Sequence, residues 1–98
     1  MELPEIPEAF QSRLRLMIVS ALIMGKKSFS ELKDVTNATD GNLSVQLSKL
    51  EAWGYVSVEK LFVNRKPLTL CTLTDVGRKA FREYVEMLNA VLEYPSED

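Results

Sequence analysis

Histidine is absent from this chain of 98 residues, and cysteine occurs once, at Cys71. Because histidine is the commonest general base in enzymes and a frequent metal ligand, its absence argues against both roles. A lone cysteine can form neither an internal disulfide nor a thiolate cluster around zinc. Long apolar runs are missing too: the longest, residues 17–24, is interrupted by Ser20 and is shorter than the ~18 residues of a membrane span.

Motifs of catalysis and of protein targeting are also missing. The chain has no glycine-rich phosphate loop and no Gly-x-Ser-x-Gly sequence, and its carboxylates are scattered over solvated faces. The first five residues, Met-Glu-Leu-Pro-Glu, lack the positive charge with which a secretory signal begins. We therefore predict a cytoplasmic protein that is not an enzyme, with no catalytic residue, no metal, no cofactor and no membrane contact.

The net charge of −2 hides an uneven distribution. Residues 26–82 hold ten basic and six acidic side chains, whereas the two ends of the chain together hold two basic and eight acidic ones. The middle of the chain is therefore mildly basic and its ends are acidic. Such a surface attracts a polyanion only weakly through charge, so recognition of one would depend on shape or on a dimer.

The hydrophobic pattern predicts a single domain over residues 1–98. Pro4 and Pro7 indicate an extended arm over residues 1–7. A first helix over 8–24 follows, because apolar residues recur at helical spacing and then cover most of the helix circumference. A helix of this kind must be buried on most sides, which suggests that it contributes to a subunit interface as well as to the core.

Two shorter helices are predicted next, over residues 30–36 and 40–53. A Ser-x-x-Glu sequence that starts at Ser28 matches a capping box before the first of them. Thr39 or Asp40 would cap the second. The second helix has a clear inward stripe of three leucines at helical spacing: Leu43, Leu47 and Leu50.

Alternating apolar residues predict a β-hairpin over 55–73, with its turn at 63–67. Thr74 then caps a final helix over 74–92, which would be ~28 Å long at ~1.5 Å per residue. The predicted fold is therefore mainly α-helical with a small β-hairpin, in the order helix, helix, helix, strand, strand, helix.

The outer face of the helix over 40–53 carries glycine, asparagine and serine. A merely solvated face would favour Glu, Lys, Arg and Gln, which are better helix formers. Short side chains let a helix approach a DNA groove closely, and Asn and Gln can bond adenine edges at two points. With a helix and a tight turn in front of it, we interpret this segment as a helix-turn-helix in preference to an ordinary amphipathic helix.

Three polar residues, Asn64, Arg65 and Lys66, occupy the predicted hairpin turn. Taken alone, they are equally well explained as a plain solvated turn. Beside a helix-turn-helix, we interpret the two cations as a wing that contacts phosphate or enters the minor groove.

The final helix is too long for a domain of this size to cover. Its far half, from Tyr84 to Leu92, would be exposed in a monomer, so pairing with a second copy explains it better than a protomer core does. The predicted dimer interface combines residues of the first and last helices: Phe10, Leu14, Met17, Tyr84, Leu88, Val91 and Leu92.

Several short motifs occur in a set order: Phe29-Ser-Glu-Leu32, Asn42-Leu-Ser44, Gln46-Leu-Ser-Lys-Leu-Glu51, Gly54-Tyr-Val56 and Leu73-Thr-x-x-Gly77-Arg78. Over about residues 10–92, this order resembles the winged-helix transcriptional regulators, and it is similar to the small single-domain regulators related to the MarR and ArsR groups. The resemblance implies an antiparallel wing, a homodimer and operator binding through the third helix. It implies DNA contacts at Thr39, Asn42, Ser44, Val45, Gln46, Ser48, Lys49, Asn64, Arg65 and Lys66.

The combined interpretation is a homodimeric winged helix-turn-helix regulator, preferentially a repressor, that binds a roughly palindromic operator in double-stranded DNA. The alternative is a winged helix used for contact with another protein, which the acidic net charge and the short wing favour. ArsR-type metal sites need Cys and His clusters, so metal sensing does not carry over. Cys71 is interpreted as a small buried hydrophobe, with a redox sensor as the alternative. The sequence leaves the operator and any effector open.

Overall fold

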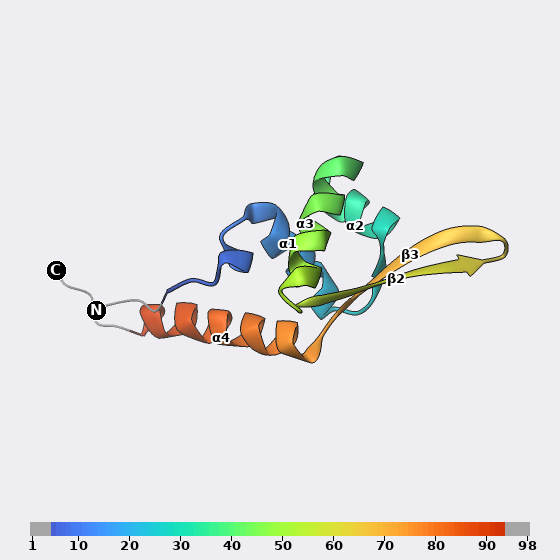
Figure 1. The fold of residues 1–98 in the computed structure, drawn as a ribbon. Helices are drawn as coiled ribbons and strands as arrows, with labels where there is room; N and C mark the ends of the chain where they lie inside the picture. The colour runs from blue at the N-terminus through green and yellow to red at the C-terminus, as the bar shows by residue number, and fades with distance from the viewer. Residues whose placement is uncertain (1–4, 94–98) are drawn as a thin grey trace.

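The computed structural model describes residues 5–93 (Figure 1). The predicted order of helices and hairpin is confirmed, with one short strand added before the second helix. The predicted arm over residues 1–7 lies partly outside the described residues. In chain order the elements are η1 Glu8–Phe10, α1 Arg13–Ile23, β1 Lys27–Ser28, α2 Phe29–Thr36, α3 Asp40–Ala52, β2 Val56–Val63, β3 Lys66–Leu73 and α4 Asp75–Leu92.

The first helix differs from the prediction over 8–24. The chain makes a short 3-10 turn, Glu8–Phe10, and α1 begins only at Arg13. Ser12 has an extended backbone, and its hydroxyl oxygen accepts a hydrogen bond from the Arg15 amide at 3.3 Å. The single-helix prediction was wrong because Ser12 is an N-cap, which starts a new helix at this point.

The added strand β1 pairs with β3, giving a three-stranded antiparallel sheet in the order β1-β3-β2. β1 ends at Ser28, which caps α2. The Ser28 hydroxyl accepts a hydrogen bond from the Glu31 amide at 3.1 Å, and the Glu31 carboxylate accepts one from the Ser28 amide at 3.0 Å. The predicted capping box is therefore confirmed, and the hydrogen bond from the Ser28 backbone lowers the pKa of Glu31.

The core lies between α1, α2, α3 and the inner end of the hairpin. The three leucines of the α3 stripe are buried in it, as predicted, together with Ile18 and Leu22 of α1. These contacts fix α3 against α1, so one face of α3 is held inside while the other stays free. Within residues 5–93, no helix is both long enough and apolar enough to cross a bilayer.

An aromatic cluster joins η1 to α4. The Phe10 ring lies 5.1 Å from the Tyr84 ring centroid, 5.8 Å from that of Phe81 and 6.0 Å from that of Tyr55. Phe10 is only 4% exposed. Its assignment to the dimer interface was therefore wrong: the turn at η1 directs the ring into the core of its own protomer, where it anchors α4.

The hairpin of β2 and β3 projects beyond the helices at one end of the molecule, and α4 runs in the opposite direction (Figure 1). The strands pair from Val56 opposite Leu73 to Val63 opposite Lys66. The turn contains only Asn64 and Arg65, with φ of 52° and 65°, which is typical of a type I′ turn. The hairpin covers the predicted residues, but its strands are longer and its turn is shorter than the predicted five-residue turn at 63–67.

Candidate nucleic-acid interface

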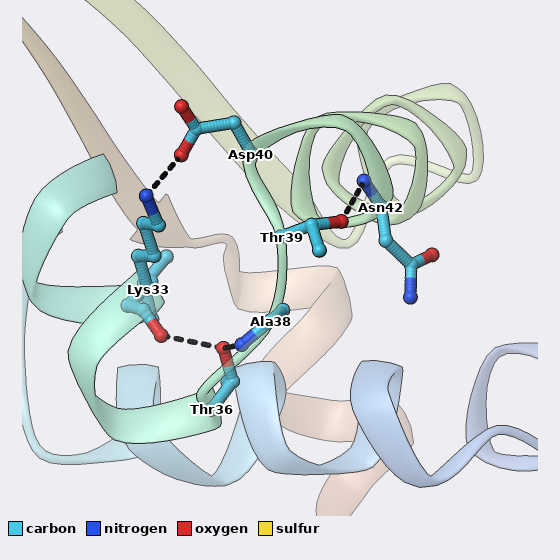
Figure 2. Close-up of polar contacts among 7 residues, drawn as sticks. Lys33, Thr36, Ala38, Thr39, Asp40 and Asn42 are labelled. Atoms are coloured by element: carbon cyan, nitrogen blue, oxygen red, sulfur yellow. Dashed lines mark hydrogen bonds and ion pairs between the residues drawn. The ribbon is translucent and has the colours of Figure 1, made fainter.

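The turn between α2 and α3 is closed by local hydrogen bonds (Figure 2). Asn37 adopts the left-handed conformation, with φ of 56°, and ends α2. The Thr36 hydroxyl donates to the Leu32 carbonyl at 2.7 Å and accepts from the Ala38 amide at 3.4 Å. The Thr39 hydroxyl then accepts from the Asn42 amide at 3.2 Å and caps α3, as predicted. The turn thereby fixes the angle at which α3 leaves α2.

An ion pair links the two helices of this motif (Figure 2). The ammonium group of Lys33 on α2 lies 2.8 Å from a carboxylate oxygen of Asp40 at the start of α3. Hydrogen bonding to Asp40 raises the pKa of Lys33. Since Lys33 neutralises Asp40, the acidic group in the first turn of α3 no longer presents a net negative charge to an approaching phosphate.

The outward face of α3 holds the predicted groove-facing residues. Val45 is near its centre and is 52% exposed. At ~100° per residue, the polar side chains form a strip on either side of Val45. Ser44 and Ser48 lie toward the hairpin, and Asn42 and Gln46 lie toward α1. Lys49 is exposed beside Val45. A surface of this size and polarity can enter a major groove.

Gln46 is held from inside the protein. The guanidinium of Arg15 donates to the Gln46 amide oxygen at 2.7 Å, to the Ala9 carbonyl at 3.1 Å and to the Glu8 carbonyl at 2.9 Å. Its carbon atom lies 5.3 Å from the Trp53 ring centroid, and Arg15 is only 8% exposed. Sequence analysis missed Arg15, because an arginine in a helix is usually exposed and its partners come from η1 and α3, which only the fold brings together.

The amide of Gln46 also donates to the Asn42 side-chain oxygen at 3.2 Å. Both polar atoms of the Gln46 amide therefore have partners inside the protein. The expected contact of Gln46 with a base remains a prediction, and the geometry favours a positioning role in which Gln46 orients Asn42.

A hollow of about 340 Å³ separates α3 from the hairpin. Phe29, Leu47 and Val58 form its apolar part, and its rim carries polar side chains from both walls: Ser44, Ser48, Glu51, Lys60 and Thr69. Lys60 was not predicted as a site residue. The alternation of residues along the strand could have identified Lys60, because it places this side chain on the same face as Val56 and Val58.

The predicted wing residues Asn64, Arg65 and Lys66 are all exposed at the far end of the hairpin. Among the described residues, neither cation forms an ion pair with a carboxylate. The structure therefore brings together, beside one hollow, a small polar helix face and a ribbon that ends in free positive charge.

Residues 14–92 match the family model described as a winged helix DNA-binding domain. This range covers most of the chain. The protein belongs to this winged-helix family.

The winged-helix protein is similar to several known proteins. An uncharacterized protein of Methanocaldococcus jannaschii is 38% identical over 78 residues, which cover 78% of this chain and 84% of the relative. A transcriptional regulator homologue from Pyrococcus horikoshii superposes with a TM-score of 0.75 and 30% identity, over 88% of this chain and 91% of that one. A protein from Enterococcus faecalis assigned to the MarR family of transcriptional regulators has a TM-score of 0.74 at 23% identity, over 83% and 74%, and shares the fold. The resemblance to winged-helix regulators is confirmed.

The remaining residues of the expected dimer interface fall into two groups. Leu14 and Met17 are half-buried and line an open hollow of about 380 Å³ beside the turn between α2 and α3. The others lie on the far half of α4, where Tyr84 and Val91 are half-buried, Leu88 is 43% exposed and Leu92 is 82% exposed. The second group includes two leucines that the protomer leaves exposed, Leu88 and Leu92.

Cys71 of the winged-helix protein is buried in β3. Burial raises the pKa of its thiol to about 11, with a smaller contribution from the charge of Glu51. Because the thiolate is the reactive form, this environment disfavours oxidation. The position supports the interpretation of Cys71 as a small buried hydrophobe over that of a redox sensor.

Proposed function

We propose that this winged-helix protein is a homodimeric transcriptional regulator, preferentially a repressor, that binds an operator in double-stranded DNA. The observation that carries the proposal is the small, polar and exposed face of α3, which lies beside a projecting wing with free cations. Membership of a winged-helix DNA-binding family supports it. Occupancy of a promoter excludes other proteins by itself, so repression requires no additional surface.

In the proposed complex, α3 enters the major groove, and different residues of its exposed face contact bases and phosphate. Asn42, Ser44 and Ser48 meet base edges, and the Val45 methyl groups can contact a thymine methyl. Lys49 contacts phosphate, which adds affinity without reading sequence. The two copies of α3 in a dimer would then occupy half-sites ~34 Å apart along the DNA, about one helical turn.

The backbone of the wing turn supports a binding role for Arg65. Arg65 has a φ of 65°, in the left-handed region that glycine adopts freely. A side chain in this conformation costs about 1 kcal/mol, and type I′ turns strongly favour Asn-Gly. An arginine placed where glycine would be more stable is explained if its charge is needed for contact with phosphate.

Replacing Arg65 with glycine is therefore expected to raise the free energy of unfolding by about 1 kcal/mol while weakening DNA binding. The dissociation constant should increase about tenfold. The slope of the logarithm of affinity against the logarithm of salt concentration should fall by about one per protomer, because each protomer loses one phosphate contact. Urea denaturation and fluorescence anisotropy at several salt concentrations measure the two effects. Arg65→Lys keeps the charge and serves as the control; unchanged affinity in Arg65→Gly would remove Arg65 from the interface.

The dimer is proposed from the apolar far half of α4. Leu88 and Leu92 are exposed in the protomer, and Val85 beside them is 37% exposed. An unpaired stripe of this kind on a long helix is typical of an interface between two copies of a chain.

The proposal is tested by selecting sequences from a pool of random duplexes at low salt and then measuring anisotropy as salt increases. We expect selection of a two-fold symmetric sequence and a steep loss of affinity with salt. Leu88→Glu should convert the protein to a folded monomer in sedimentation and weaken operator binding at least 100-fold, while Leu88→Met should have little effect. A folded dimer that binds no duplex at any salt concentration would instead favour a protein-interaction module.

A further inference from the structure

The outer half of the wing carries an aromatic side chain that its own protomer does not cover. Phe62, in the second-last position of β2, is 80% exposed. The fold does not require an apolar residue there, because the hairpin has already left the core by this point and a polar residue such as Thr also suits an exposed strand position. A phenyl ring kept in water at the end of a wing indicates a contact outside the protomer.

Strand register places Phe62 on the side of the wing that faces α3. Phe62 is paired with Pro67 and, two positions nearer the core, Lys60 is paired with Thr69. Paired residues and every second residue along a strand share one face. Lys60 and Thr69 line the hollow beside α3, so Phe62 and Pro67 continue this same face toward the wing tip.

The length of the wing suits the neighbouring minor groove. Val58 is the outermost β2 residue that packs against the core. Phe62 lies four residues beyond Val58 along the strand, which corresponds to ~13 Å at ~3.3 Å per residue. The turn at Asn64 lies six residues beyond Val58, which corresponds to ~20 Å. One helical turn of B-DNA is ~34 Å long, and a major groove lies half a turn, or ~17 Å, from the next minor groove. With α3 in the major groove, the end of the wing therefore reaches the adjacent minor groove.

Charge identifies nucleic acid as the partner of this end of the wing. Between residues 56 and 73 the hairpin has three cations, Lys60, Arg65 and Lys66, and a single acid, Glu59. Glu59 is paired with Leu70, on the opposite face to Phe62. Lys60 shares the face of Phe62, Arg65 lies in the turn, and Lys66 is paired with Val63 on the opposite face. The outer part of the wing therefore carries a net positive charge, which matches a groove bordered by phosphates.

We propose that Phe62 and Pro67 form an apolar wedge that enters the minor groove and partly unstacks a base step, bending the DNA. Phenylalanine and proline are among the side chains that act in this way in minor-groove proteins. Unstacking is easiest at pyrimidine–purine steps, so the wedge selects such a step at a position that α3 does not touch. This inference rests on the proposed DNA binding and adds a source of specificity to it.

The test uses the full-length protein and the duplex selected from the random pool, with 2-aminopurine substituted in turn at each step beside the half-sites. Wild type should raise 2-aminopurine emission severalfold at one step and bend the duplex in a gel-phasing assay. Phe62→Ala should abolish both signals, weaken binding about tenfold and lose the preference for a pyrimidine–purine step. Phe62→Leu, which keeps an apolar wedge, should retain part of each signal.

Leu61→Ala is the matched control. Leu61 is the neighbour of Phe62 on the reverse face of the wing and is 37% exposed, so its replacement should leave the unstacking signal unchanged. Equal melting temperatures for the variants and wild type would confirm that the fold is intact. If Phe62→Ala binds and bends DNA as wild type does, the wedge is overturned while DNA binding stands. If wild type binds no duplex, both proposals fail.

Discussion

Replacing Arg15 with alanine is expected to lower the free energy of unfolding by about 3 kcal/mol. Three acceptors would lose the hydrogen bond from Arg15: the Glu8 carbonyl, the Ala9 carbonyl and the side-chain oxygen of Gln46. The Glu8 carbonyl would keep the hydrogen bond from the Gln11 amide at 3.1 Å. A buried acceptor left without a partner costs about 1–3 kcal/mol, and water can replace the donor at the more accessible sites. Urea denaturation followed by circular dichroism measures the change.

Two further variants separate the charge of Arg15 from its packing. Arg15→Met keeps an apolar stem but no donors, so its loss should approach that of alanine. Arg15→Lys keeps the charge on a compact ammonium group, which cannot match the planar, five-donor geometry of a guanidinium, so its loss should be intermediate. A change below about 0.5 kcal/mol for Arg15→Ala, the range of ordinary surface substitutions, would contradict a role in holding η1 and α3 together.

Trp53 provides a direct readout of this site. It is the only tryptophan in the chain, and the Arg15 guanidinium lies 5.3 Å from its ring centroid. The emission of the folded protein should therefore change in Arg15→Met and change least in Arg15→Lys. Equal emission from all variants would place the guanidinium away from the ring.

The position of Arg15 also has a functional consequence. Among the described residues no carboxylate pairs with it, so the buried cation is compensated only by neutral oxygens and the Trp53 ring. These partners come from η1 and from α3 with its C-cap Trp53, and the chain of contacts continues through Gln46 to Asn42. A folded Arg15 variant is expected to lose base preference more than salt dependence, because the helix face moves while the phosphate-binding cations remain.

Local rules explain which parts of the fold could be predicted from the sequence. The starts of α2, α3 and α4 follow from Ser28, Thr39 and Thr74, whose hydroxyls each accept a hydrogen bond from an amide three residues later. The buried face of α3 follows from leucines at helical spacing. The exposed face follows from residues that a merely solvated helix would not favour.

The missed features depend on contacts between distant parts of the chain. β1 is only two residues long and exists because Lys27 and Ser28 reach Cys71 and Leu70, so no local pattern can indicate it. The burial of Arg15 depends on the η1 turn and on α3, which together supply its partners. The break before α1 was predictable in principle from Ser12, but the apolar spacing continues across it and suggested a single helix.

Hydrogen bonds of Thr74 hold the start of α4 against the turn between α3 and β2, and Gly77 lies where the two segments meet. The Thr74 amide donates to the Tyr55 carbonyl at 3.0 Å, and the Thr74 hydroxyl donates to the Gly54 carbonyl at 2.6 Å. The Thr74 hydroxyl also accepts from the Gly77 amide at 3.0 Å. These bonds bring the first turn of α4 so close that Gly77 has no room for a side chain. The glycine of the motif Leu73-Thr-x-x-Gly77 is therefore explained by the close contact between the backbones of Gly77 and Tyr55.

Gly77→Ala is accordingly expected to destabilise the protein by about 3 kcal/mol, the upper range for overpacking. An added methyl group would meet the Tyr55 carbonyl oxygen far inside van der Waals contact and the Leu73 Cδ1 atom at 2.8 Å. The Tyr55 backbone cannot move aside, because its amide donates to the Leu50 carbonyl at 2.9 Å. The helix would have to shift, breaking the bonds of Thr74. Thermal and urea denaturation measure the loss.

The sign of this effect distinguishes it from helix propensity. Glycine to alanine inside a helix normally stabilises by about 1 kcal/mol. Gly41, on the exposed side of α3, has nothing within 4 Å of the site of an added methyl group. Gly41→Ala should therefore stabilise while Gly77→Ala destabilises, and the same sign for both would contradict the close contact. Since α4 carries Leu88 and Leu92, its displacement in Gly77→Ala should also weaken the proposed dimer, and operator affinity should fall further than stability alone explains.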